Sequence, residues 1–223
     1  QILIKIISSE DEETRDKITK ATNWQNPIQP ATLRATDRIQ RLIEENLKGV
    51  GLYYDRRKNY YKNLGKPADR IISIPLMAQA VMSIILAKPD SARARPSSLI
   101  KEQEVYSSIF SEDYPIKLYT NSALLLRIVD IGLKELLAFD ARDRANVRFY
   151  VLYWIAVTIT GKLLPRPNDI ATMNLTIISP ELLESALRYV RETYLNLGGG
   201  DQLAKGTLLK LTLEIALREN GAS

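Results

Sequence analysis

The spacing of apolar residues along most of this chain is that of amphipathic helices. One stripe is formed by Ile39, Ile43 and Leu47, which recur at intervals of four residues. Thr36 suits the N-cap of this helix and Gly49 suits its end. The same kind of spacing predicts further helices at about residues 9–22, 75–88, 97–110, 117–138, 142–163, 180–196 and 202–219.

Two short segments have the β-branched and aromatic residues of strands instead. They are "ILIKII" at residues 2–7 and "VGLYYDRR" at residues 50–57. The sequence therefore predicts a mainly α (α+β) fold, with a small N-terminal βα-α-β element packed on a multi-helix bundle. We expect residues 1–66 to form the first part and residues 67–223 the bundle. Because the first part is small and begins at a strand, we expect it to complete a larger α/β subdomain upstream.

Capping and turn residues predict where several elements begin and end. Ser9 with Glu12 fits a capping box for the first helix. Pro75 suits the first turn of a helix, and "DARDR" at residues 140–144 suits a helix start. We expect loops at residues 90–99 ("DSARARPSSL") and 167–169 ("PND"), and a flexible joint at residues 197–201 ("LGGGD").

The composition excludes several kinds of active site. The chain has no cysteine and no histidine, which removes thiol nucleophiles, Ser-His-Asp arrangements and nearly all zinc chemistry. Catalysis would need carboxylates, lysine, tyrosine or a Mg²⁺ ion held by oxygens. The sequence shows neither a credible cluster of metal-binding carboxylates nor a P-loop. We therefore predict no catalytic residue, no metal and no cofactor, which favours a chain that is not an enzyme.

The longest strongly apolar run without a charge is "FYVLYWIAVTITG" at residues 149–161. At 13 residues it is too short to span a bilayer. No signal peptide is visible in the sequence. We therefore expect no membrane partner.

Positive charge is concentrated in one part of the chain. The net charge is +5, and residues 34–95 hold 13 Lys/Arg and 6 Asp/Glu, which is +7 for the segment and −2 for the rest. A local basic surface with tyrosines among the cations is typical of proteins that bind a nucleic-acid backbone. The alternative is a basic segment that is solvated or paired within the chain. The candidate phosphate contacts are Arg34, Arg38, Arg41, Arg56, Arg57, Lys58, Arg93 and Arg95.

Amides surround a tryptophan where the first helix should end, in "TKATNWQNPIQP" at residues 19–30. Asn23 can end a helix and Asn26 before Pro27 is a turn signal, so one interpretation is a structured turn. The other is recognition, because carboxamides can bind base edges and an exposed tryptophan can stack on a base. We expect a polar cleft that is lined by Asn23, Trp24, Gln25, Asn26, Asp37, Gln40 and Tyr54.

Within that cleft, Asp37 and Gln40 lie three residues apart and share one helix face. Asp37 beside arginines either forms a plain salt bridge or orients guanidinium groups that bind phosphate. Tyr53 and Tyr54 point to opposite faces of a strand, so we expect one of them in the core and the other to be available.

The N-terminal segment resembles the abortive phage infection protein family, AIPR. The resemblance rests on a strand that ends in "KII" at residues 5–7, on "ITKATNWQNPI" at 18–28, on "LRATDRIQ" at 33–40 and on "GLYYDRR" at 51–57. It continues through about residue 110. It implies a cytoplasmic bacterial protein that takes part in defence against phage. It also implies an upstream Asn-Gly-x-Gln-Thr motif, which this sequence does not contain.

Three functions remain open from the sequence. The working hypothesis is a module that binds nucleic acid, either DNA or RNA, through the cations named above. The competing hypothesis is a protein-interaction or sensing domain, with a separate effector or a second copy of the chain as partner. Its long apolar helices should then expose an apolar patch. The third is a nuclease-like enzyme whose site needs the absent upstream motif.

Overall fold

The computed structural model describes residues 8, 11–23, 34–95, 98–135 and 140–223. The strand expected at residues 2–7 lies outside the described residues, as do Trp24, Gln25 and Asn26 of the expected cleft. Asn23 is the last residue of the first helix.

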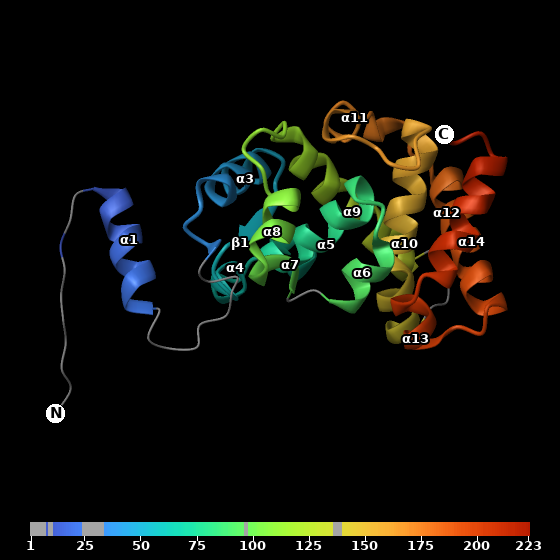
Figure 1. Ribbon diagram of the computed structural model, residues 1–223, viewed down its shortest axis with the longest axis horizontal. Helices are drawn as coiled ribbons and strands as arrows, with labels where there is room; N and C mark the ends of the chain where they lie inside the picture. The colour runs from blue at the N-terminus through green and yellow to red at the C-terminus, as the bar shows by residue number, and fades with distance from the viewer. Residues whose placement is uncertain (1–7, 9–10, 24–33, 96–97, 136–139) are drawn as a thin grey trace.

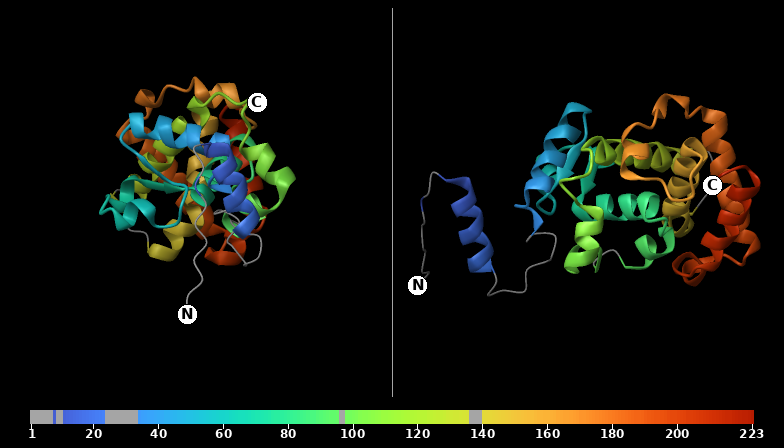
Figure 2. Two further views of the ribbon diagram at one scale, coloured as in Figure 1. Left: turned by 90° about the vertical axis from the view of Figure 1, so that its left-hand side faces the viewer. Right: turned by 45° about the horizontal axis from the view of Figure 1, so that its top comes forward.

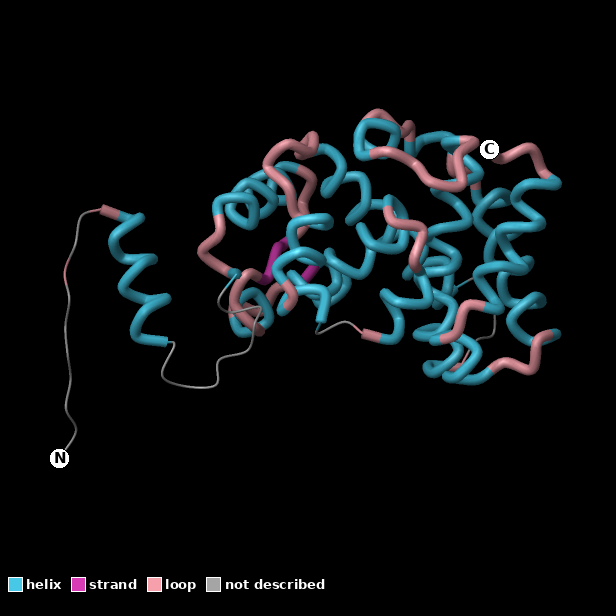
Figure 3. Tube along the Cα trace, in the orientation of Figure 1, coloured by secondary structure: helices cyan, strands magenta, loops and turns pink. Residues whose placement is uncertain are grey.

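The N-terminal part combines helices with a two-stranded parallel sheet. Its elements are α1 (Glu12–Asn23), α3 (Arg38–Gly49), β1 (Tyr53–Asp55), α4 (Tyr60–Asn63), the 3-10 helix η1 (Ala68–Arg70) and β2 (Ile71–Ser73). Tyr53 pairs with Ile71 and Asp55 with Ser73, and Figure 3 shows both strands surrounded by helices. Parallel strands need a crossover connection. Here that connection is residues 56–70, which carry α4 and a dense group of cations.

The rest of the described chain is helical. Its elements are α5 (Ile74–Ile85), α6 (Pro89–Ala94), α7 (Ser98–Lys101), α8 (Gln103–Ile109), α9 (Lys117–Glu135), α10 (Ala141–Thr160), α11 (Pro167–Ala171), the 3-10 helix η2 (Leu175–Ile177), α12 (Pro180–Asn196), α13 (Gly200–Lys205) and α14 (Leu208–Glu219). α10 packs against α5 and α9 on one side and against α12 and α14 on the other (Figures 1 and 2). α1 lies at the opposite end of the molecule from α14 (Figure 1).

The apolar run of residues 149–161 contains the whole second half of α10 and ends at its C-cap, Gly161. Residues 149–157 are all buried, because neighbouring helices cover α10 on every side. This run is therefore a core helix. Among the described helices, none is long and apolar enough to cross a membrane.

The structure confirms a mainly α fold with a small β element. It also confirms several local predictions. Asp140 caps α10 by accepting a hydrogen bond from the backbone N–H of Asp143 at 2.7 Å. Pro75 lies in the first turn of α5, where Ser73 is the N-cap. The division between residues 1–66 and 67–223 falls between the paired strands β1 and β2 and stays a prediction.

The capping box expected at Ser9 lies outside the described residues, and at the start of α1 the carboxylate of Asp11 accepts from the backbone N–H of Thr14 at 3.0 Å. Other local predictions are wrong. Asp37 rather than Thr36 is the N-cap residue of α3. Residues 89–94 form α6 and residues 167–171 form α11, where we expected loops. In both cases a proline begins the helix at a position where no backbone N–H is needed.

Two expected helices are each divided in the structure. The helix expected at residues 97–110 is interrupted at Glu102, which has extended backbone between α7 and α8. The helix expected at residues 202–219 is interrupted at Gly206, which separates α13 from α14. The expected joint at residues 197–201 is shorter than expected, because α13 already begins at Gly200.

A glycine lets α9 and α12 approach closely. A Cβ atom at Gly132 would lie 2.9 Å from Cδ1 of Leu187 and 3.0 Å from Cδ2 of Leu183. Both leucines are in the hydrophobic core. The contact between these helices therefore leaves little room for a side chain at residue 132.

We expect Gly132→Val to lower the free energy of unfolding by about 1–3 kcal/mol, because overpacking displaces core side chains. Gly132→Ala is the matched control. Its effect should be smaller, because the leucine ends can shift and alanine favours a helix over glycine by about 1 kcal/mol. Urea unfolding followed by circular dichroism measures both. A valine variant as stable as the wild type would contradict the close packing of α9 on α12.

Candidate functional site

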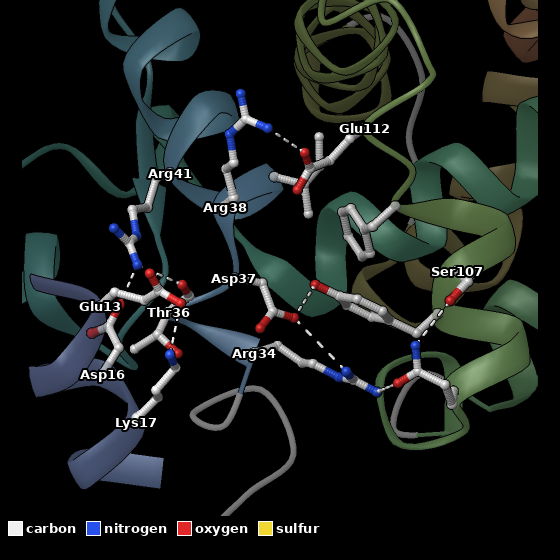
Figure 4. Close-up of a pocket in the computed structure, with 14 residues that line it drawn as sticks. Glu13, Asp16, Lys17, Arg34, Thr36, Asp37, Arg38, Arg41, Ser107 and Glu112 are labelled. Atoms are coloured by element: carbon white, nitrogen blue, oxygen red, sulfur yellow. Dashed lines mark hydrogen bonds and ion pairs between the residues drawn. The ribbon is translucent and has the colours of Figure 1, made fainter.

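A polar cleft lies where α1, the start of α3 and α8 meet (Figure 4). Its volume is about 670 Å³. Acidic and basic side chains line it in equal number, so the cleft has little net charge. The charged lining residues are Glu13, Asp16, Asp37 and Glu112 with Lys17, Arg34, Arg38 and Arg41.

A chain of hydrogen bonds runs from the floor of this cleft into the core. Tyr106 of α8 donates from its hydroxyl to Oδ2 of Asp37 at 2.9 Å. The same hydroxyl accepts from Nε2 of Gln40 at 2.9 Å. Oε1 of Gln40 in turn accepts from the hydroxyl of Tyr54 at 2.5 Å. Gln40 and Tyr54 are fully buried.

Burial fixes the protonation of the two tyrosines in this chain of hydrogen bonds. It raises the pKa of Tyr54 well above the ordinary value, and it also raises the pKa of Tyr106. Both hydroxyls therefore keep their protons even at alkaline pH and act as donors. Asp37 and Gln40 do lie on one face, as expected, but only Asp37 reaches the cleft while Gln40 lies beneath it.

Arg34 is held within the cleft by several groups. Its guanidinium lies 3.8 Å from Oδ2 of Asp37 and donates to Oε1 of Gln103 at 2.8 Å and to the carbonyl of Ile100 at 3.3 Å. It also lies 4.0 Å from the centre of the Tyr106 ring, which is a cation–π contact. Binding a phosphate here would disturb these contacts.

The other two arginines of the cleft also pair with carboxylates. Arg38 lies 2.7 Å from Glu112, and its side chain is 75% exposed. Arg41 pairs with Asp16 of α1 and donates to the carbonyl of Thr36 at 2.9 Å. The structure thus brings Arg34, Arg38 and Arg41 together, but each has an acidic neighbour.

A second group of cations lies on the crossover connection and at the end of α3, away from these three. We call it the β1–α4 surface and define it by five exposed cations and one exposed tyrosine: Lys48, Arg57, Lys58, Tyr60, Lys62 and Lys66. A pocket of about 250 Å³ indents it, and this pocket is lined by Glu44, Lys48, Arg56, Arg57, Tyr60 and Tyr61. Within the described residues, no ion pair engages Arg57, Lys58 or Lys62.

Arg56 has a different environment from Arg57. Its Nε lies 2.6 Å from a carboxylate oxygen of Glu44, and its Nη1 donates to the carbonyl of Ala35 at 2.5 Å. The hydroxyl of Tyr61 donates to the other oxygen of Glu44 at 2.8 Å. Burial and this hydrogen bond raise the pKa of Tyr61 to about 12. Arg56 therefore supports the floor of the pocket.

The remaining two candidate cations lie on or beside α6, which packs on α10 and α13. Arg93 donates to Oδ1 of Asn146 at 3.0 Å and pairs with Asp201 at 2.8 Å. Asn146 donates to the hydroxyl of Tyr194, which links α10 to α12. Arg93 is thus part of the packing of the C-terminal helices, whereas Arg95 is exposed.

Several residues of these sites were missed by sequence reasoning. Tyr106, Gln103 and Glu112 lie on or next to α8, whose pattern gives no sign that it faces the start of α3. Glu44 lies on α3, but its partner Arg56 comes from a different element. In the described part of the chain, no three or more His, Cys, Asp or Glu side chains are placed to hold a metal ion.

Comparisons with known proteins give one match. The model of the AIPR protein family matches residues 1–194, which is most of the chain. α13 and α14 lie beyond the matched residues. No curated protein and no solved structure matches the chain.

We expect Tyr106→Phe to lower the free energy of unfolding by about 1–3 kcal/mol, because it leaves Nε2 of the buried Gln40 without its acceptor. Tyr60→Phe is the matched control, since Tyr60 is an exposed residue. That variant should stay within about 0.5 kcal/mol of the wild type. Chemical unfolding of the three proteins tests this, and equal stabilities would contradict the buried chain of hydrogen bonds.

Proposed function

The chain belongs to the AIPR family, whose members are associated with abortive infection in defence against phage, and on this premise we propose that it is a nucleic-acid-binding module. One observation supports the proposal. Residues 56–66 hold five Lys/Arg and no Asp or Glu, and four of these cations belong to the exposed β1–α4 surface. Under this proposal the protein acts in the cytoplasm, where it would encounter phage DNA and RNA.

The β1–α4 surface is a better candidate than the polar cleft. In the cleft, carboxylates of the chain itself already neutralise the arginines. On the β1–α4 surface, Glu44 is engaged by Arg56 and Tyr61, and Asp55 is buried. Its exposed cations are therefore available to phosphate groups. Each phosphate that they neutralise would release counterions and strengthen binding at low salt.

This choice changes the set of residues to be tested. Arg57 and Lys58 remain the main candidates, and Lys48, Lys62 and Lys66 join them because they share the surface. Three other candidates, Arg34, Arg56 and Arg93, make contacts within the folded chain. A substitution at one of them could lower the affinity for nucleic acid simply because the variant folds less well. We therefore do not assign them to the phosphate contacts.

The double variant Arg57→Ala/Lys58→Ala should weaken the binding of labelled DNA or RNA oligonucleotides. The slope of log K against log salt should fall in magnitude by about 1–2 between about 50 and 200 mM salt, because two phosphate contacts are lost. Fluorescence anisotropy measures both quantities. The control is Arg142→Ala/Arg188→Ala, which removes the same charge from exposed positions on α10 and α12.

Two outcomes would contradict the proposal. The first is no binding of any oligonucleotide by the wild type at low salt. The second is an equal loss of affinity in both double variants, because net charge alone would then explain the binding. Circular dichroism of each variant shows whether it has kept its helices.

A second candidate function is favoured by a different observation. Leu208, Leu211 and Ile215 recur at helical spacing on α14 and are 54%, 52% and 60% exposed. They lie opposite the buried face of the helix, which holds Leu209 and Leu213. Such a stripe favours a protein-interaction module.

A second copy of the chain is the partner that fits this stripe. In an antiparallel two-fold pairing of α14 helices, Leu208 of one copy would face Ile215 of the other, and the two Leu211 side chains would meet. Lys210 and Glu214 pair with each other within one copy, so this pairing would rest on the leucine and isoleucine side chains of the stripe.

Under this second function, the wild type should have the mass of a dimer in light scattering at raised protein concentration. Leu211→Glu should have the mass of a monomer, because two carboxylates would meet at the centre of the pairing. Lys101→Glu, at an exposed position on α7, is the control for the added negative charge. A wild type that stays monomeric at every concentration would rule out this pairing.

A further inference from the structure

We propose that the β1–α4 surface takes single-stranded rather than duplex nucleic acid, with one base stacked on the ring of Tyr60. This inference rests on the proposed function and specifies its ligand. It is carried by an exposed aromatic ring that the structure holds at the mouth of a cationic pocket.

Tyr60 is exposed but supported from below. It is 48% exposed, and its ring packs edge to face with the ring of Tyr61, with the ring centres 5.0 Å apart and the planes at 79°. Tyr61 is only 7% exposed and is anchored through its hydroxyl to Glu44. A rigid aromatic platform of this kind loses little conformational entropy when a base stacks on it.

The backbone around Tyr60 is also fixed. Asn59 adopts a left-handed conformation with φ of 62°, which turns the chain directly before α4. The buried carboxylate of Asp55 then accepts from the backbone N–H of Tyr61 at 2.9 Å. The N–H of Tyr60 donates to the carbonyl of Arg57 at 3.0 Å. These contacts hold Tyr60 beside Arg57 and Lys58.

The size of the pocket favours an unpaired nucleotide. Its volume of about 250 Å³ suits one nucleotide and is far too small for a duplex. In a duplex each base is covered on both faces by its neighbours, so an aromatic side chain can stack only on a base that is free of them. Lys48 and Arg57, which line the pocket, and the exposed Lys58 next to Arg57 would contact the phosphates on either side of that base.

The test uses three labelled probes of equal length in fluorescence anisotropy. They are a single strand of mixed sequence, the duplex of that sequence, and a single strand in which abasic sites replace all the nucleotides. The proteins are the wild type, Tyr60→Ala, Tyr60→Phe and Arg57→Ala/Lys58→Ala. Tyr60→Phe keeps the ring, and Tyr60→Ala removes it.

The inference predicts that the wild type binds the single strand more tightly than the duplex and the abasic strand. Tyr60→Ala should lose about 5- to 150-fold in affinity for the single strand, since stacking of one base has an effect of this size. It should lose nothing for the abasic strand, because that probe has no base to stack. Its salt slope should not change, whereas Arg57→Ala/Lys58→Ala should reduce the slope for all probes. Tyr60→Phe should bind like the wild type.

The other outcomes separate the two proposals. Equal binding of all three probes, or a loss in Tyr60→Ala that is the same for every probe, overturns the stacking and leaves phosphate binding in place. No binding of any probe by the wild type overturns both. The affinities of the wild type for the single strand and for the abasic strand can be compared without any variant. The inference is therefore tested even if Tyr60→Ala fails to fold.

Discussion

The N-terminal half of the structure depends on one buried carboxamide. Gln40 of α3 accepts a hydrogen bond from Tyr54 of β1 and donates one to Tyr106 of α8. An unpaired buried group of this kind costs about 1–3 kcal/mol, so the three elements are held in the arrangement that satisfies both ends of the amide. Tyr106 is thereby placed within reach of Asp37, and the end of β1 is placed beside α3. Both the cleft and the β1–α4 surface depend on this arrangement.

Neighbouring cations in the sequence have different roles because of where the chain directs them. Arg56 and Arg57 follow β1 directly and look equivalent in the sequence. Both lie in the bend that follows Asp55, the last residue of β1. Arg56 is directed to Glu44 and the carbonyl of Ala35, whereas Arg57 is directed to solvent. The direction of each side chain and the nearest carboxylate therefore decide whether a candidate cation is structural or available. The density of charge along the sequence gives neither of these two properties.

The fold was more predictable than the site for a physical reason. Helices leave a periodic local signal in the sequence, and spacing, prolines and caps located α5, α10 and α12 within a few residues. The β-branched and aromatic residues around β1 located that strand in the same way. At α6 and α11 the expected loops are short helices, each of which begins at a proline, a residue that suits the first turn of a helix. Tyr106 could not have been assigned to the site, because its contact with Gln40 joins residues that are 66 positions apart. The hydropathy pattern indicates that such a tyrosine is buried, but it does not indicate which polar group its hydroxyl binds.

The same contacts give a reason to place ligand binding on the β1–α4 surface. Through Arg56, the floor of its pocket is joined to Ala35, and through Glu44 it is joined to α3, which also carries Gln40. A surface that is fixed from below by partly buried hydrogen bonds needs little ordering when a ligand arrives, and ordering of side chains is a main cost of association. The cleft has the opposite property, because a ligand there would first have to separate Arg34, Arg38 and Arg41 from their carboxylates. The physical difference between the two sites is thus the state of their cations before binding, and it favours the exposed surface.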